Sequence, residues 1–192
     1  MITSHIGNCS HYSYGKLPER VMNYDFDKLW EIHPKEKGTV KLYGKEIETP
    51  RYVQSYLKDY TFSGITHKAE QLPKQFQKFM DEIAIPLNPN YNMVHVNWYE
   101  DGTHYIGPHS DDEKEMIEDS DILSISLGAT RTFRIREKKT KKIIKDLELK
   151  DGQYLIMGGE FQKHYTHEIV KINGKKAKET KKRINLTFRC FK

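Results

Sequence analysis

Apolar residues follow two periods along this chain, helical in the first half and two-residue in the second. Residues 73–84 carry an apolar stripe at the spacing of one helix face, with Pro73 suited to the first turn and Pro86 expected to end the helix. A shorter helix is predicted for residues 25–32, where three apolar side chains fall on one side. Both stripes predict packing against a core.

From residue 91 onward apolar and polar residues alternate, which is typical of β-strands. The predicted strands lie within residues 91–97, 121–127, 132–136, 143–149, 153–157, 165–171 and 183–191. Gly158 and Gly159 are expected to break the strand that precedes them. Residues 39–64 mix short extended pieces with turns, and residues 1–24 are predicted to be irregular. Many short strands separated by turns indicate a barrel or a jelly roll.

Size and composition fit one globular domain. The chain has 192 residues, of which 31% are charged and 36% hydrophobic, enough for a sizeable core. It has no apolar run of membrane-spanning length and no signal peptide, and its two cysteines cannot form a disulfide framework. We therefore expect an intracellular, monomeric protein that does not bind membranes. We expect one domain over residues 1–192, with residues 1–40 as an N-terminal extension of unclear role.

The net charge of +5 fits a polyanionic partner such as nucleic acid. Ordinary enrichment in lysine would give the same charge, so charge alone leaves both interpretations open.

His109 and Asp111 are candidate metal ligands. Side chains two residues apart leave the same face of an extended strand, so this imidazole and carboxylate could share a divalent ion. A second histidine would complete the two-histidine, one-carboxylate triad of non-haem Fe(II) oxygenases. His164 and His167 are the candidates, and because they would face opposite ways on a strand, only one can join. Two polar residues on a solvated strand would show the same His-x-Asp pattern.

The last predicted strand, residues 183–191, has one apolar face and one polar face. Its polar face carries Arg183, Asn185, Thr187 and Arg189. An amphipathic strand at the edge of a sheet would look the same. Two aligned arginines could instead grip a small dicarboxylate, because guanidinium pairs with carboxylate as a bidentate fork.

These motifs together resemble the AlkB family of Fe(II)- and 2-oxoglutarate-dependent dioxygenases, over about residue 42 to the C-terminus. The resemblance is strongest to the homologues that demethylate double-stranded DNA. It is carried by Tyr-Thr-Phe-Ser-Gly at 60–64, Tyr-Glu-Asp-Gly at 99–102, His-Ser-Asp-Asp-Glu at 109–113 and Arg-Ile-Asn-Leu-Thr-Phe-Arg at 183–189. All four occur in the family's order and spacing.

The resemblance implies a role for each matching residue. The iron ligands would be His109, Asp111 and His167. The 2-oxoglutarate contacts would be Asn97, Tyr99, Arg183, Thr187 and Arg189. Contacts to the flipped base would come from Tyr60, Phe62, Asp112 and Glu113. A loop that enters the duplex would contain Tyr43, Gly44 and Lys45, and a nucleotide-recognition lid would contain Arg51.

The resemblance also implies a fold and an activity. The fold would be α+β but mainly β, a double-stranded β-helix (jelly roll) with N-terminal helices packed outside. The enzyme would use Fe(II), 2-oxoglutarate and O2 to demethylate 1-methyladenine and 3-methylcytosine in DNA, and possibly in RNA, releasing formaldehyde, succinate and CO2. Two alternatives remain: the same chemistry on a protein or small molecule, and a catalytically silent nucleic-acid-binding module.

Tyr43 has two competing interpretations. The residue is aromatic in a stretch rich in charge, and a folded protein would ordinarily bury it. If exposed, it could fill the gap left by an extruded base, while Lys41 and Lys45 meet phosphates.

Overall fold

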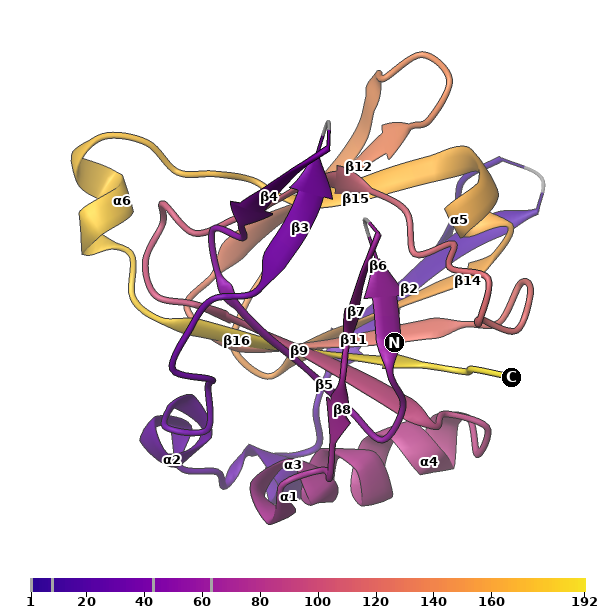
Figure 1. The fold of residues 1–192 in the computed structure, drawn as a ribbon. Coiled ribbons are helices and arrows are strands. Elements are labelled where there is room, and N and C mark those ends of the chain that lie inside the picture. Colours follow the sequence, from indigo (N-terminus) through magenta and orange to yellow (C-terminus); the bar gives the residue numbers. More distant parts are fainter. Residues whose placement is uncertain (1, 8, 43, 63) are drawn as a thin grey trace.

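Two antiparallel sheets build the protein, which the computed structural model describes over residues 2–7, 9–42, 44–62 and 64–192 (Figure 1). The main sheet contains, in spatial order, β1 (Ile2–His5), β2 (Ser10–Lys16), β14 (Gln153–Gly159), β11 (Ile122–Gly128), β16 (Arg183–Arg189), β9 (Met93–Tyr99), β5 (Tyr52–Tyr56) and β8 (Ala69–Glu70). Only the β5–β8 pair in it is parallel. The second sheet contains β10 (Ile106–His109), β15 (Tyr165–Ile169), β12 (Arg131–Glu137) and β13 (Ile143–Leu149).

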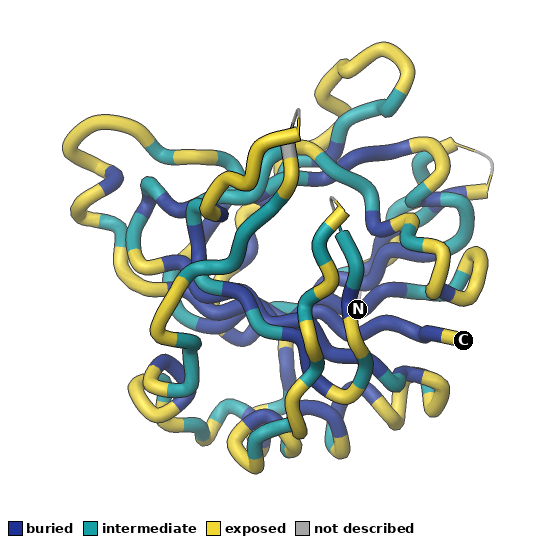
Figure 2. The backbone as a smooth tube through the Cα atoms, viewed as in Figure 1, coloured by how far each residue is buried: buried dark blue, intermediate teal, exposed yellow. Residues whose placement is uncertain are grey.

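Two hairpins complete the β-structure and lie next to each other (Figure 1). One consists of β3 (Thr39–Leu42) and β4 (Lys45–Glu48), the other of β6 (Tyr60–Phe62) and β7 (Ile65–His67). Every residue of β4 is exposed, whereas every residue of β9 and β16 is buried. Figure 2 shows this contrast between the exposed strand β4 and the buried strands of the main sheet.

The helices pack mainly on the outer face of the main sheet (Figure 1). They are α1 (Glu19–Met22), α2 (Phe26–Trp30), α3 (Lys74–Phe79), a π-helix (Met80–Ala84) and α4 (Ile85–Leu87). The remaining two are α5 (Phe161–His164) and α6 (Lys175–Glu179). Phe76 and Phe79 from the predicted stripe are fully buried, and Trp98 of β9 donates a hydrogen bond to the Leu29 carbonyl at 3.0 Å. The predicted jelly roll with helices packed outside is therefore confirmed.

The predicted irregularity of residues 1–24 is wrong. β2 pairs with β14 along its whole length, and β1 pairs with β2. Gly158 and Gly159 do not break β14, because they pair with His11 and Ser10. A Cβ at Gly158 would lie 2.4 Å from His11 Nε2 and from Asp121 Oδ1, so glycine is what lets the N-terminal strand approach.

The helix expected to end at Pro86 continues to Leu87. Pro86 lies in α4 directly after the π-helical segment, in which the Ile85 N–H bonds to the Met80 carbonyl five residues back. This wider turn comes just before the position at which proline has no N–H to donate. Within the described ranges, no helix is long and apolar enough to cross a membrane.

Candidate metal centre and active site

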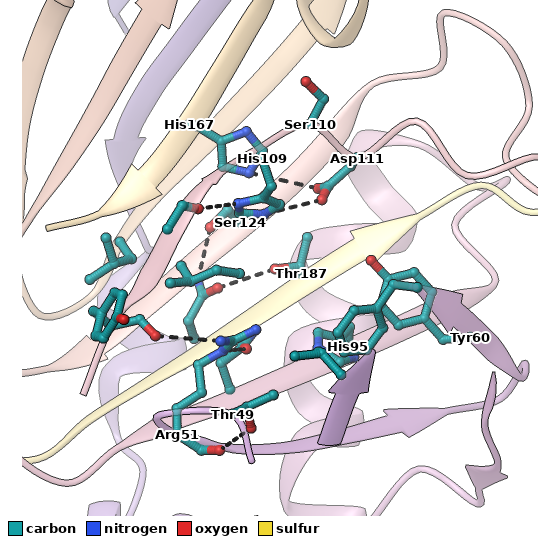
Figure 3. A pocket seen from close by; sticks show the side chains of 18 of the residues that line it. Thr49, Arg51, Tyr60, His95, His109, Ser110, Asp111, Ser124, His167 and Thr187 are labelled. Carbon is teal, nitrogen blue, oxygen red and sulfur yellow. Dashed lines mark hydrogen bonds and ion pairs between the residues drawn. The ribbon is translucent and has the colours of Figure 1, made fainter. Parts of the chain in front are cut away.

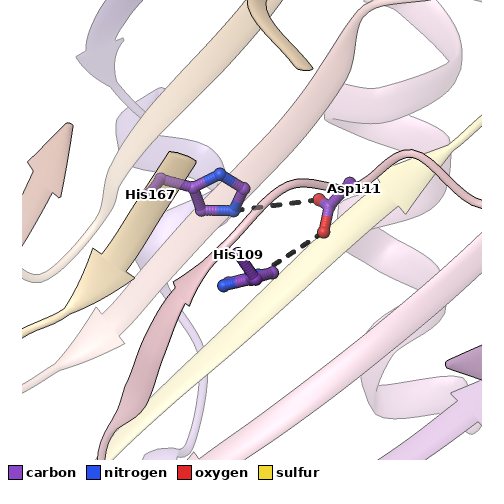
Figure 4. A group of neighbouring side chains, drawn as sticks. All are labelled: His109, Asp111 and His167. Atoms are coloured by element: carbon purple, nitrogen blue, oxygen red, sulfur yellow. Dashed lines mark ion pairs between the residues drawn. The ribbon is translucent and has the colours of Figure 1, made fainter. Parts of the chain in front are cut away.

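The structure brings His109, Asp111 and His167 together at the mouth between the two sheets (Figure 4). One ligand atom from each lies within 4.8 Å of the others. His109 Nε2 is 3.5 Å from Asp111 Oδ1, and His167 Nε2 is 3.9 Å from Asp111 Oδ2. The histidines come from neighbouring strands, since His109 of β10 is in register with His167 of β15.

Local structure holds each of the three side chains. The strand ends at His109, so Asp111 lies in the following loop rather than on the extended strand that the sequence suggested. Its backbone N–H donates to Gln162 Oε1 at 3.0 Å, and this keeps the carboxylate on the side of the histidines. His109 Nδ1 hydrogen-bonds to the Gly107 carbonyl at 2.9 Å, which leaves Nε2 for a metal. Phe133 stacks on the His167 ring with centroids 5.2 Å apart.

The three residues fit a divalent metal ion. Ligand atoms about 2.1 Å from a shared ion and at right angles to one another would be about 3 Å apart, so the measured separations need only small side-chain movements. Asp111 Oδ1 is buried without a hydrogen-bond partner among the described residues.

Burial alone would raise the pKa of Asp111, but Arg189 and both histidines hold it well below its usual value. Burial and the neighbouring His109 lower the pKa of His167 to about 3, so both side chains are in the protonation state that binds metal.

His164 takes no part in this cluster. It is the last residue of the short helix α5 and not, as expected, a residue of a strand. Its ring is exposed, with Nε2 3.2 Å from Glu160 Oε2. Of the two histidines that the sequence left open, geometry thus selects His167.

A cavity of about 530 Å³ begins at the three candidate ligands and extends along β9, β11 and β16 (Figure 3). The edge-strand interpretation of residues 183–189 is wrong, because β16 lies between β11 and β9 and is buried on both faces. Its polar face points into the cavity. The lining residues on these strands include Asn97, Tyr99, Ser124, Arg183, Asn185, Thr187 and Arg189.

Arg183 and Arg189 occupy different environments within this cavity. Arg189 Nη2 is 3.0 Å from Asp111 Oδ2. Burial alone would lower the pKa of Arg189, but the neighbouring Asp111 carboxylate raises it. Arg183 has one hydrogen bond, from Nη2 to Ser126 Oγ at 2.9 Å, while its Nε and Nη1 are buried without partners among the described residues. Burial lowers the pKa of Arg183 to about 10, so it remains a cation at neutral pH. Two buried guanidinium nitrogens that have no partner among the described residues are a ready site for a carboxylate that enters the cavity.

Tyr60 and Phe62 line the other end of the cavity, on β6. Their ring centroids are 4.9 Å apart, and Phe62 stacks on His67 at 4.5 Å. The Tyr60 hydroxyl donates to Glu113 Oε1. Burial raises the pKa of Glu113, whose second carboxylate oxygen is buried without a partner among the described residues.

Two predicted substrate residues lie in different places. Asp112 is exposed at the rim and accepts a hydrogen bond from Lys138 Nζ at 2.9 Å. Arg51 is buried, donates from Nε to Asn97 Oδ1 at 2.6 Å and contacts the Tyr105 carbonyl at 3.4 Å. Arg51 therefore lies against a predicted co-substrate contact rather than on an exposed lid.

Tyr43 lies outside the described residues. Its neighbour Gly44 has a φ of +79° with no atom within 4 Å of a Cβ placed there, and Lys45 is exposed. The hairpin around this position therefore projects from the body of the protein (Figure 1).

The lining residues that sequence reasoning did not identify include His95, Ser124 and Tyr105. His95 and Ser124 alternate with apolar residues on buried strands, so their position across from β16 could be found only from the pairing of the strands. Tyr105 lies in a loop and carries no periodic signal.

A jelly roll with two histidines and one carboxylate at its mouth defines the class of non-haem Fe(II) oxygenases. Comparison with known proteins gives the same class. Residues 23–189 match the 2OG-Fe(II) oxygenase superfamily. The chain is 32% identical to DNA oxidative demethylase ALKBH2 of Mus musculus over 187 residues, covering 92% of this chain and 76% of that protein. It is 29% identical to the Homo sapiens protein of the same name over 193 residues, covering 95% and 72%.

A solved structure, that of OsALKBH1, superposes with a TM-score of 0.62 at 19% identity, covering 93% of this chain and 97% of that one. The likeness supports the jelly-roll fold. The chain belongs to the 2OG-Fe(II) oxygenase superfamily and, within it, to the AlkB family. Its cofactor and co-substrates are accordingly Fe(II), 2-oxoglutarate and O2.

Proposed function

We propose that this protein is an oxidative demethylase of N-alkylated bases, 1-methyladenine and 3-methylcytosine, in DNA. The observation that carries the proposal is the single cavity that runs from the candidate iron ligands to the Tyr60–Phe62 aromatic pair. The relatives named DNA oxidative demethylase, in mammals and in Arabidopsis thaliana, support the choice of substrate. When bound, iron and 2-oxoglutarate supply, with O2, the oxidation of an N-methyl group that ends in release of formaldehyde, succinate and CO2.

The inner residues of the cavity would bind and orient the co-substrate. Arg183, with two unpaired nitrogens, would take its distal carboxylate, which would otherwise be buried without a partner at a cost of several kcal/mol. Arg189, which pairs with Asp111, would stay beside the metal and keep that carboxylate ionised. Arg51 would hold the Asn97 side chain in place.

The outer residues would bind the extruded base. Extrusion is required because the methyl group is inaccessible within a duplex. An aromatic ring that stacks on an extruded base contributes about 1–3 kcal/mol, which suits Tyr60 and Phe62. A cationic methylated base would favour the ionised form of Glu113, whose pKa is raised by burial.

Preference for double-stranded DNA and a monomeric state remain predictions from the sequence. The projecting β3–β4 hairpin supports the first of them, since Lys41 and Lys45 on it are exposed and available to phosphates. Size-exclusion chromatography with light scattering would test the second.

Repair of a methylated oligonucleotide tests the proposed function. With Fe(II) and 2-oxoglutarate present, mass spectrometry should show loss of one methyl group from a duplex carrying 1-methyladenine or 3-methylcytosine. The Asp111→Asn variant is the matched control and should leave the base methylated. Succinate formed without any demethylation would favour a protein or small-molecule substrate, and absence of both products would favour a silent binding module.

A further inference from the structure

His95 is a buried polar residue of the cavity that the proposed roles leave unused. It lies on β9 opposite Ser55 of β5 and Thr187 of β16, with 3% of its surface exposed. Its ring centroid is 4.8 Å from Tyr60 and 6.0 Å from Phe62 (Figure 3). His95 therefore lies where the aromatic pair meets the inner wall of the cavity.

Ser55 determines which nitrogen of the His95 ring carries the proton. Ser55 Oγ lies 3.1 Å from His95 Nδ1, and among the described residues this is the only hydrogen bond of either side chain. Ser55 is fully buried, so its hydroxyl proton would have no acceptor if it pointed away from His95. Leaving that buried donor without an acceptor costs more free energy than leaving one lone pair of the hydroxyl oxygen without a donor. The hydroxyl thus donates to Nδ1, and the neutral ring carries its proton on Nε2.

The surroundings of the ring keep it neutral. Burial, together with the charges of Arg189, Arg51 and His67, lowers the pKa of His95 well below its usual value, and Asp111 only partly offsets this. The cavity therefore receives an N–H donor without a positive charge, which does not repel a cationic base.

We infer that His95 determines base specificity: its Nε2–H donates to a carbonyl oxygen beside the methylated nitrogen and so favours 3-methylpyrimidines over 1-methyladenine. The inference rests on the proposed function and adds the class of base that the cavity prefers.

The chemistry of the two bases gives this preference. In 3-methylcytosine the methylated N3 is flanked by an amino group and by the O2 carbonyl. In 1-methyladenine the methylated N1 is flanked by an amino group and by C2–H, so neither neighbour accepts a hydrogen bond. A donor that meets the O2 flank of the pyrimidine is therefore satisfied, whereas neither flank of 1-methyladenine satisfies it. A site that offers a hydrogen bond discriminates against a ligand that leaves it unmade.

Competition between two lesions in one sequence context tests the inference. The readout is the ratio of kcat/KM for 3-methylcytosine to that for 1-methyladenine, measured on otherwise identical oligonucleotides. His95→Leu should lower this ratio about tenfold, the value expected for one hydrogen bond of about 1.4 kcal/mol. His95→Gln keeps an N–H donor and should keep the ratio near that of the wild type. Ser55→Ala should lower the ratio by less than His95→Leu, because the ring can then adopt either tautomer.

An unchanged ratio in a folded His95→Leu protein, with wild-type affinity for 2-oxoglutarate, would overturn the inference alone. If His95→Leu does not fold, His95→Gln and Ser55→Ala test the inference. A kcat/KM ratio that falls in His95→Gln but stays unchanged in Ser55→Ala would contradict the assignment of the proton to Nε2. Wild-type protein that demethylates neither base would overturn the proposed function, and this inference with it.

Discussion

The inner wall of the cavity, formed by β9, β11 and β16, differs from its rim, formed by the hairpins β3–β4 and β6–β7. All residues of β9 and β16 are buried, and these strands pair on both sides within the main sheet. The hairpins are separate two-stranded sheets, and all of β4 is exposed. Polar side chains on the inner wall are held by surrounding strands, whereas those on the rim depend on a few local contacts.

This difference separates the chemistry from the choice of substrate. Residues that hold iron and co-substrate need fixed positions, which buried paired strands provide. Most residues proposed to meet the substrate lie on the two hairpins, which are attached to the body by fewer strand pairings and range from the buried Tyr60 to the fully exposed strand β4. Substitutions of the residues that hold iron and co-substrate should therefore affect every substrate. Substitutions on the rim, and at His95 where the inner wall meets the aromatic pair, should affect some substrates more than others.

The largest effect is expected at Asp111. Asp111→Asn keeps an oxygen for Arg189 but removes the negative charge that binds the metal. Turnover should therefore fall at least about 100-fold, because losing a residue that only hydrogen-bonds to a metal ligand already costs up to about that much. Asp111→Ala should also lower the free energy of unfolding by about 3–5 kcal/mol, because the buried Arg189 loses its partner. Demethylation assays and thermal unfolding check both results, and full activity of Asp111→Asn with iron present would disprove its role as a ligand.

The two histidines near the end of the second sheet form a matched pair. His167→Ala should lose Fe(II) binding, because it removes one of three clustered ligand atoms. His164→Ala should keep it, because that ring is exposed and contacts Glu160. Metal titration of both variants is the measurement, and the reverse pattern would show that the cluster in the structure is not the metal site.

A smaller effect is expected at Arg183. Arg183→Met removes a charge-assisted contact to the co-substrate, so the apparent KM for 2-oxoglutarate should rise about 10- to 100-fold, as for a loss of about 1.5–3 kcal/mol. The free energy of unfolding should change little, since two of the guanidinium nitrogens have no partner in the protein. Arg189→Met is the control, and it should destabilise the fold because Asp111 is then left unpaired. Equal co-substrate dependence in wild type and Arg183→Met would contradict this assignment.

The smallest effect is expected on the rim. Tyr43→Ala should reduce repair of double-stranded DNA several-fold more than repair of single-stranded DNA, because only a duplex leaves a gap in the stack. Lys45→Ala, on the described part of the β3–β4 hairpin, should weaken binding mainly at low salt. Equal losses on both substrates for Tyr43→Ala would indicate a packing role, and no loss on either would show that the hairpin does not reach the DNA.

The inner wall was more predictable from sequence than the N-terminal strands. The alternation in residues 183–189 is a local pattern that the fold retains, since its polar residues line the cavity. The His109-x-Asp111 motif is also local and marks two residues that do come together, although Asp111 follows the strand and does not lie on it. β2 mixes tyrosine, serine and histidine without clear alternation, and it becomes a strand only by pairing with β14, more than a hundred residues further along the chain. The same pairing explains why Gly158 and Gly159, normally breakers, continue β14. His95 was missed for a related reason, since its neighbours Ser55 and Tyr60 are brought to it only by the fold.

The stoichiometry of the reaction tests most directly whether one cavity joins the iron site to a methylated base. Succinate and formaldehyde should be measured together, with the wild-type protein on duplexes that differ only in one methyl group. We predict little succinate with the unmethylated duplex, a marked increase with the methylated one, and about one formaldehyde per additional succinate. Succinate formation that is the same with both duplexes, without formaldehyde, would contradict the account.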